Sequence, residues 1–205
     1  MNFRLKPASL IALSLIVLVV FGASGALLFG AYVRHSEGVV IRAVGSWLPA
    51  AKVGSRSIRY GEYLDHVDAA AKFMAIQGPA EGLSGAMTDA ERAGALDRAV
   101  RIHAVQEMAD EMNIVVTPLD LDRAIDQTLM QAGTSTTIGE FREYLDKVYG
   151  WNEDEFKRFI LGPALLEEGV KRAFVRDGKT EADFTAELDR RMSEPYAKRY
   201  LKFSN

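Results

Sequence analysis

Residues 113–170 decide the fold of this chain, and they read NIVVTPLDLDRAIDQTLMQAGTSTTIGEFREYLDKVYGWNEDEFKRFILGPALLEEGV. Thr117, Thr137 and Asn152 are residue types that cap helix N-termini, and a carboxylate follows each of them three positions later. Three helices are therefore predicted, and they end at Gly133, at Tyr149-Gly150 and at Gly162-Pro163, where the last one breaks or restarts. Apolar residues recur three and four positions apart in each, so every helix has one face to bury.

The rest of the chain after residue 50 continues this helical pattern and begins with a short β element. Gly54-Ser55 has turn chemistry and lies between two extended pieces, Ala51–Val53 and Ser57–Arg59. Further helices are predicted over residues 60–77, 89–112, 163–176 and 180–202, of which the last is strongly charged. We therefore expect a mostly α-helical domain with a minor short β element.

The chain divides into four parts by composition. Residues 1–36 are predicted to form a cytoplasmic stub and a transmembrane anchor, and residues 37–50 a linker with one strand around Val39–Val44. Residues 51–176 are the helical domain. Residues 177–205 form a charged C-terminal helix, which either packs back on the domain or projects as an interaction arm.

Charge and cysteine content exclude several classes of function. The 205 residues carry a net charge of -3, and Arg4 and Lys6 are the only charged side chains before Arg34. The remainder of the chain therefore carries -5, which argues against a general nucleic-acid binder. The chain has no cysteine, which excludes disulfides, thiol catalysis and cysteine-ligated metals.

The N-terminal segment has the composition of a membrane span. No residue from Pro7 to Val33 is charged, and this run exceeds the ~20 residues that cross a bilayer. A cleaved signal peptide is the alternative, with a cleavage site at Ala23-Ser24-Gly25, but the apolar run continues beyond that point. We therefore predict a single-pass helix that crosses the bilayer through residues 8–33. The basic pair before it favours a cytoplasmic N-terminus and a domain on the outer side.

Three small residues in the predicted span are spaced for helix packing. Gly22, Ala26 and Gly30 lie four positions apart on one helix face, as in small-xxx-small contacts between membrane helices. They are the candidate contact for a homodimer or for a membrane-protein partner. Because small residues are common in membrane spans, a span without a specific partner is the alternative interpretation.

Three segments together resemble a known family of folding factors. They read KVGSRSIRYGEYLDHV at residues 52–67, MADEMNIVVTPLDLDRAI at residues 108–125, and GTSTTIGEFREYLDKVYGWNEDEFKRFI at residues 133–160. In their order and spacing they resemble the N-terminal chaperone domain of the SurA, PpiD and PrsA family of extracytoplasmic folding factors. The resemblance covers roughly residues 51–175, and the single N-terminal span is similar to that of PpiD.

The resemblance implies a chaperone domain without the catalytic part of the family. Isomerases of this family carry a parvulin domain after the helical region, whereas only about thirty residues follow Val175 here. We therefore expect no isomerase activity in this chain and no cofactor. The expected ligands are unfolded or nascent exported polypeptides.

Flexible and aromatic side chains are the candidates for polypeptide binding. Unbranched, polarizable methionines adapt to varied partners, and aromatic rings add contact area. Core packing is the competing role for each of these residues, because a small helical domain needs most of its apolar residues for itself. The candidate residues are Met74, Met108, Met112, Met130, Phe141, Tyr149 and Trp151.

The histidines do not indicate a metal site. His103 and Glu107 are one helical turn apart, and two ligands do not close a site, so we interpret them as a solvated pair. His66 is expected on the polar face of its helix between Asp65 and Asp68.

The leading hypothesis is therefore a chaperone in the bacterial inner membrane, with its domain on the periplasmic side, that holds polypeptides by weak apolar contacts. The alternative is a structural or assembly subunit that binds one specific membrane protein.

Overall fold

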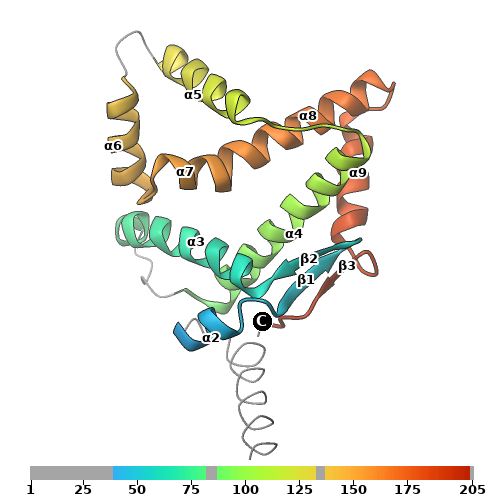
Figure 1. Cartoon of the computed structure of the whole chain (residues 1–205), viewed down its shortest axis with the longest axis horizontal. Helices are drawn as coiled ribbons and strands as arrows, with labels where there is room; N and C mark the ends of the chain where they lie inside the picture. Colours follow the sequence, from blue (N-terminus) through green and yellow to red (C-terminus); the bar gives the residue numbers. More distant parts are fainter. Residues whose placement is uncertain (1–38, 82–86, 133–136, 204–205) are drawn as a thin grey trace, which may run out of the picture.

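The computed structural model describes residues 39–81, 87–132 and 137–203, and in it a small sheet packs against long helices (Figure 1). The elements are α2 (Val39–Val44), β1 (Pro49–Val53), β2 (Arg56–Arg59), α3 (Tyr60–Glu81), α4 (Asp89–Glu111), α5 (Pro118–Ala132), α6 (Ile138–Tyr149), α7 (Glu153–Phe156), the π-helical turn η1 (Lys157–Leu161), α8 (Gly162–Arg176), α9 (Glu181–Met192) and β3 (Ala197–Arg199). The prediction of a mostly helical domain with a minor β element is confirmed.

The predicted membrane span, residues 8–33, with Gly22, Ala26 and Gly30, lies outside the described residues. Within the described ranges, no helix combines the length and apolar character needed to cross a bilayer.

Local capping signals set the helix starts as predicted. Thr88, Thr137, Asn152 and Thr180 each accept a hydrogen bond from the third backbone amide of their helix, and the acidic side chain at that position bonds back to the cap. Each capping box satisfies two backbone donors that the first helical turn leaves unpaired.

The prediction that residues 37–50 form a linker is wrong for residues 39–44 and for the residues just before β1. Residues 39–44 form α2 rather than a strand, because Ile41 is buried in the core and Arg42 donates two hydrogen bonds to Asp68 of α3, at 2.6 and 3.0 Å. Leu48 and Ala50 are buried in the same core. The domain therefore includes α2 and begins before residue 51.

The expected C-terminal helix is also wrong beyond Met192. Pro195 cannot continue a helix, and α9 is followed by a turn and by β3, which pairs antiparallel with β1. The sheet order is β2-β1-β3, with Lys52 opposite both Ser57 and Lys198. Because β3 completes the sheet, the C-terminal segment packs back on the domain.

One large core lies between the sheet and the helices α3, α4, α8 and α9. Tyr60, Leu64, Val100, Phe184 and Leu188 are among its fully buried side chains. Two smaller clusters lie outside it, one around Ala69, Trp151 and Phe159, and one around Ile125, Phe141 and Leu145. The two small clusters hold α5, α6 and α7 against the rest of the domain.

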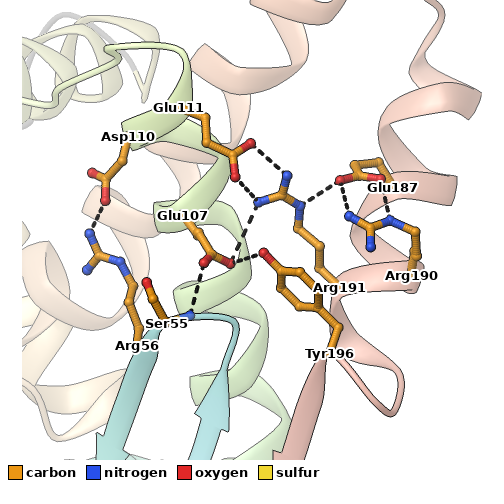
Figure 2. A network of polar contacts seen from close by, with 9 residues as sticks. All are labelled: Ser55, Arg56, Glu107, Asp110, Glu111, Glu187, Arg190, Arg191 and Tyr196. Carbon is orange, nitrogen blue, oxygen red and sulfur yellow. Dashed lines mark hydrogen bonds and ion pairs between the residues drawn. The ribbon is translucent and has the colours of Figure 1, made fainter.

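Glu107 of α4 anchors the β1–β2 turn to the C-terminal segment (Figure 2). The backbone amide of Ser55 donates to its Oε1 at 3.2 Å, and the Tyr196 hydroxyl donates to its Oε2. Gly54 has φ +51, and a Cβ at this position would lie 2.1 Å from the Glu107 Oε1. Glycine is therefore required here both for the turn and for the approach of the carboxylate.

Arg191 of α9 extends this network and is itself buried. Its guanidinium donates to Glu111 at 2.7 and 2.9 Å and to Glu187 at 2.6 Å. The hydrogen bond with Glu111 raises the pKa of Arg191, and the hydrogen bonds from Arg190 and Arg191 lower the pKa of Glu187 to about 2. The network joins the first hairpin, α4 and the last helix through charge-assisted hydrogen bonds.

Candidate functional site

An apolar groove of about 490 Å³ lies between α3, the N-terminal half of α4, and the segment that runs from the end of α6 into η1. We call it the aromatic groove. It is lined by His66, Ala69, Ala70, Phe73, Met74, Met87, Glu91, Gly94, Ala95, Arg98, Tyr149, Trp151, Phe156, Phe159 and Ile160.

Three stacked rings form one wall of the aromatic groove. Tyr149 lies between Phe73 and Trp151, with ring centroids 5.8 and 5.5 Å apart and interplanar angles of 20° and 23°. Phe73 is 37% exposed, whereas Trp151 is buried. The stack therefore runs from solvent into the protein, and the apolar surface that it offers becomes more buried from Phe73 to Trp151.

The Gly150-Trp151 step positions the buried end of the stack. Gly150 ends α6 in the left-handed conformation with φ +67, a geometry that glycine adopts without strain. The chain then turns so that the Trp151 indole Nε1 donates to the backbone oxygen of Ala69, at 3.0 Å. Asn152 follows immediately as the cap of α7. The predicted helix-Gly-Trp-helix pattern thus pins α6 and α7 to α3.

A π-helical turn forms the floor of the aromatic groove. Pro163 has no backbone N–H to donate, and the amide of Gly162 bonds to the oxygen of Lys157, five residues earlier. The predicted break at Gly162-Pro163 is in fact this wide turn, through which the helix continues into α8. The turn carries Phe159 and Ile160, which both line the groove.

His66 is a buried wall residue of the groove, so its predicted place on a polar helix face is wrong. Its ring packs edge-on against Phe159 with centroids 5.3 Å apart. Burial lowers the pKa of His66 to about 4, and the cations Arg98 and Arg158 add to this effect. Glu62 and Asp65 on its own helix act in the opposite direction. At neutral pH His66 is therefore an uncharged part of the apolar surface.

The predicted pair of His103 with Glu107 is also wrong. His103 instead contacts Glu62 of α3, with 2.5 Å between Nε2 and Oε1, while Glu107 belongs to the network in Figure 2. Burial raises the pKa of Glu62, but the hydrogen bond and the charge interaction with His103 outweigh it, and the net shift is downward. Within the described ranges, no cluster of three or more histidines and carboxylates could hold a metal ion.

The predicted binding residues occupy different parts of the structure. Met74, Tyr149 and Trp151 line the aromatic groove together. Met108 is 1% exposed in the main core, so its prediction as a binding residue is wrong; its spacing from Leu96, Val100 and Ala104 already indicated a core face.

The remaining three predicted residues lie away from the groove. Phe141 is buried in the small cluster beside Ile125, where its ring meets Phe156 edge-on. Met112 is partly buried against the main core, and Met130 on α5 is 77% exposed. The prediction missed Phe73, His66, Phe159 and Ile160 as groove residues, because only the packing of α3 against η1 brings them together.

A family model described as the SurA-like N-terminal domain matches residues 2–162. No curated protein and no solved structure matches the chain. The match ends where α8 begins, although α8, α9 and β3 contribute to the same core as the matched part.

Proposed function

The chain belongs to the family of SurA-like N-terminal domains, and on this basis we propose that it is a membrane-anchored, extracytoplasmic chaperone that holds unfolded or newly translocated polypeptides in the aromatic groove. The family gives it a chaperone-related role at a general level. Membrane anchoring, the groove as binding site and the holding of clients are the specific parts of the proposal.

The observation that carries the proposal is the composition of the aromatic groove. Its walls combine rigid rings, such as Phe73 and Tyr149, with the unbranched side chains of Met74 and Met87. Rings supply contact area at a low entropic cost, while methionines adapt to side chains of different shape. Such a surface is suited to bind many apolar sequences weakly rather than one sequence tightly.

Holding a client in this way requires no catalysed reaction. Apolar contacts along a groove of about 490 Å³ suit a few side chains of an extended segment. Glu91 and Arg98 also line the groove; the Glu91 carboxylate accepts hydrogen bonds from Thr88, so Arg98 supplies the charge for the polar backbone of a client. The proposal therefore includes neither a cofactor nor isomerase activity.

The anchor rests on the apolar run in the sequence. We propose that residues 8–33 cross the inner membrane once, with the N-terminus in the cytoplasm and the domain in the periplasm. An anchor confines the groove to the surface where translocated chains emerge, which raises its effective concentration toward them.

The test is an aggregation assay with the full chain in nanodiscs and several unrelated unfolded proteins. Replacing Phe73 and Met74 by serine removes the exposed apolar side of the groove. Burial of one such side chain contributes about 1.5–3 kcal/mol, so we expect the double variant to lose about tenfold or more in apparent client affinity.

The matched control replaces Val175 and Leu119 by serine. Both are more than half exposed and lie outside the groove, so this variant should hold clients like the wild type. Thermal unfolding of both variants checks that each is folded. Equal holding by the groove variant and the control would refute the groove as the client site, and no holding by the wild type would refute the chaperone function.

A second candidate function rests on α5 and α6. Met130, Ile138 and Tyr144 are exposed on these helices, and a fixed apolar partner would cover them. In that case the chain is an assembly subunit of one membrane protein. Stoichiometric co-purification of a single membrane protein, lost in a Met130→Ser/Tyr144→Ser variant, would favour this function over the chaperone.

A further inference from the structure

The outer face of the sheet differs in charge from the rest of this acidic chain. Lys52, Arg59 and Lys198 are exposed on the three strands and alternate with residues that are buried against the helices. Cross-strand register places Lys52 directly opposite Lys198 on β3 and Ser57 on β2. Three cations thus share one small surface, which we call the basic sheet face.

The basic residues on the two faces of the sheet differ in whether they form ion pairs. Arg56 pairs with Asp110 and Arg199 pairs with Asp97, both on α4. Lys52, Arg59 and Lys198, in contrast, are exposed and form no ion pair with any of the described residues. The unneutralised charge is therefore confined to the side that faces away from the domain.

The pairing of Lys52 with Lys198 carries an energetic cost. Like charges directly opposite each other on antiparallel strands destabilise the pair. An external anionic surface would remove that cost and contribute about 1 kcal/mol for each cation that approaches it. Charge complementarity therefore points to an extended anionic partner rather than to a single small anion.

Chain length places such a surface within reach. The apolar run ends at Val33 and α2 begins at Val39, so five residues, 34–38, separate the proposed span from the domain. Even fully extended, this connection spans at most about 20 Å. In Figure 1, α2 and the sheet lie at one end of the domain, whereas α5 lies at the other.

An aromatic side chain accompanies the basic sheet face. Trp47 is 64% exposed, although it lies two residues before β1 and next to the buried Leu48. Tryptophan prefers the interface between lipid headgroups and acyl chains, where its ring is half solvated. Cations and an exposed indole at the same end of the domain are the combination that suits a lipid surface.

We propose that the basic sheet face docks on the anionic phospholipid headgroups of the membrane that anchors the chain. This inference rests on the proposed anchor. Docking fixes the orientation of the domain, with the sheet on the lipid and the helices α5 and α6 directed away from it. The contact weakens as salt screens the headgroups.

The test uses the full chain in vesicles of phosphatidylcholine with or without phosphatidylglycerol. Lysine side chains are labelled with an amine reagent and measured by mass spectrometry, and Trp47 fluorescence is quenched by brominated lipid, which the buried Trp151 does not reach. With the anionic lipid we expect labelling of Lys52 and Lys198 to fall about fivefold, in line with about 1 kcal/mol per cation. High salt should restore it, and Lys147 on α6 should not change.

Charge reversal provides the matched variants. Lys52→Glu/Lys198→Glu should abolish the lipid-dependent quenching of Trp47, whereas Arg123→Glu/Lys147→Glu changes the net charge equally on α5 and α6 and should retain it. Loss of quenching in both variants would refute a role for the sheet face in particular.

Separate outcomes test the anchor and the docking. A chain that carbonate strips from both kinds of vesicle contradicts the anchor and, with it, this inference. A chain that is retained in both, but whose labelling is independent of anionic lipid, contradicts docking alone and leaves the anchor in place. Protection that appears only when an acidic polypeptide is added would overturn docking and assign the face to a protein ligand.

Discussion

The base of the domain, which comprises the sheet with α3, α4, α8 and α9, and the arm, which comprises α5 and α6, bury very different amounts of apolar surface. The base contains one continuous core, which includes residues from Ile41 of α2 to Leu201 after β3. The arm is held by a small cluster around Ile125, Phe141 and Leu145, while Met130 and Tyr144 remain exposed.

This difference assigns the stability of the domain to the base and the adjustment of the binding groove to the arm. The base also contains the network around Glu107 and Arg191, which joins segments from both ends of the described chain (Figure 2). The aromatic groove lies at the junction, where α3 of the base meets the segment that follows the arm. Parts of a protein with few buried contacts open at low free-energy cost, so the arm can adjust the groove while the base stays folded.

The largest expected effect comes from truncating one buried ring in the base. Phe184→Ala removes a side chain that is buried against Phe174 and should cost about 4 kcal/mol of unfolding free energy. Because the core is continuous, the loss should appear in the global unfolding transition. In the arm, Leu145→Ala should cost about 3 kcal/mol but act locally. Urea denaturation and hydrogen exchange of the full chain in detergent measure both effects.

Hydrogen exchange decides whether base and arm are separate units. Leu145→Ala should speed amide exchange in α5 and α6 and leave α4 protected, whereas Phe184→Ala should speed exchange in α4 as well. The exposed Val175→Ala change should be within about 0.5 kcal/mol of the wild type. Uniformly faster exchange in the Leu145→Ala variant would mean that the domain unfolds as one unit.

A second expected effect tests the network of the base. In Gly54→Ala the new Cβ meets the Glu107 carboxylate, and the residue is also strained at φ +51. Displacement of Glu107 breaks its bonds to Ser55 and Tyr196, so we expect a loss of about 3 kcal/mol. Gly178→Ala is the control, because Gly178 has φ +78 but open space around it, and should cost only about 1 kcal/mol. Equal losses measured by denaturation would leave backbone strain as the whole explanation.

The sequence predicted those features that depend on neighbours in the chain. The capping boxes at Thr88 and Thr137, the Gly54-Ser55 turn and the Gly150-Trp151 step are all local, and the structure contains each of them. Tyr149, Trp151 and Met74, which were predicted to bind polypeptides because of their aromatic or flexible side chains, line the aromatic groove together, and their role in binding stays a prediction.

Errors arose where distant segments decide the structure. β3 exists because β1 is available to pair with it, and Ala197 faces Val53 from the other end of the domain. As a helix, α2 buries Ile41 in the core and brings Arg42 to Asp68 of α3. His66 lies between acidic neighbours and so resembled a surface residue, yet the π turn brings Phe159 against it. The periodicity of one helix carries no information about such partners, which are distant in the sequence.

The smallest expected effect concerns the junction between base and arm and depends on pH. The pKa of His66 is about 4 in the folded protein, below the ordinary 6.5 of an unfolded chain. Between these values the unfolded state binds the proton more readily, so stability falls as the pH decreases from about 6.5 to about 4. At pH 5 the loss relative to pH 7.5 should be about 2 kcal/mol. Urea denaturation of the full chain in detergent at both pH values measures it.

His66→Phe isolates this contribution, because it keeps a ring against Phe159 but cannot bind a proton. Carboxylates that do not interact with His66, such as Glu187, titrate in both proteins, so their effects cancel when the pH dependence of the variant is subtracted from that of the wild type. The difference should be close to zero above pH 7 and favour the variant below pH 6. An identical pH dependence of both proteins would mean that His66 is solvated, and the groove wall would then be open to water at α3 even when no client is bound.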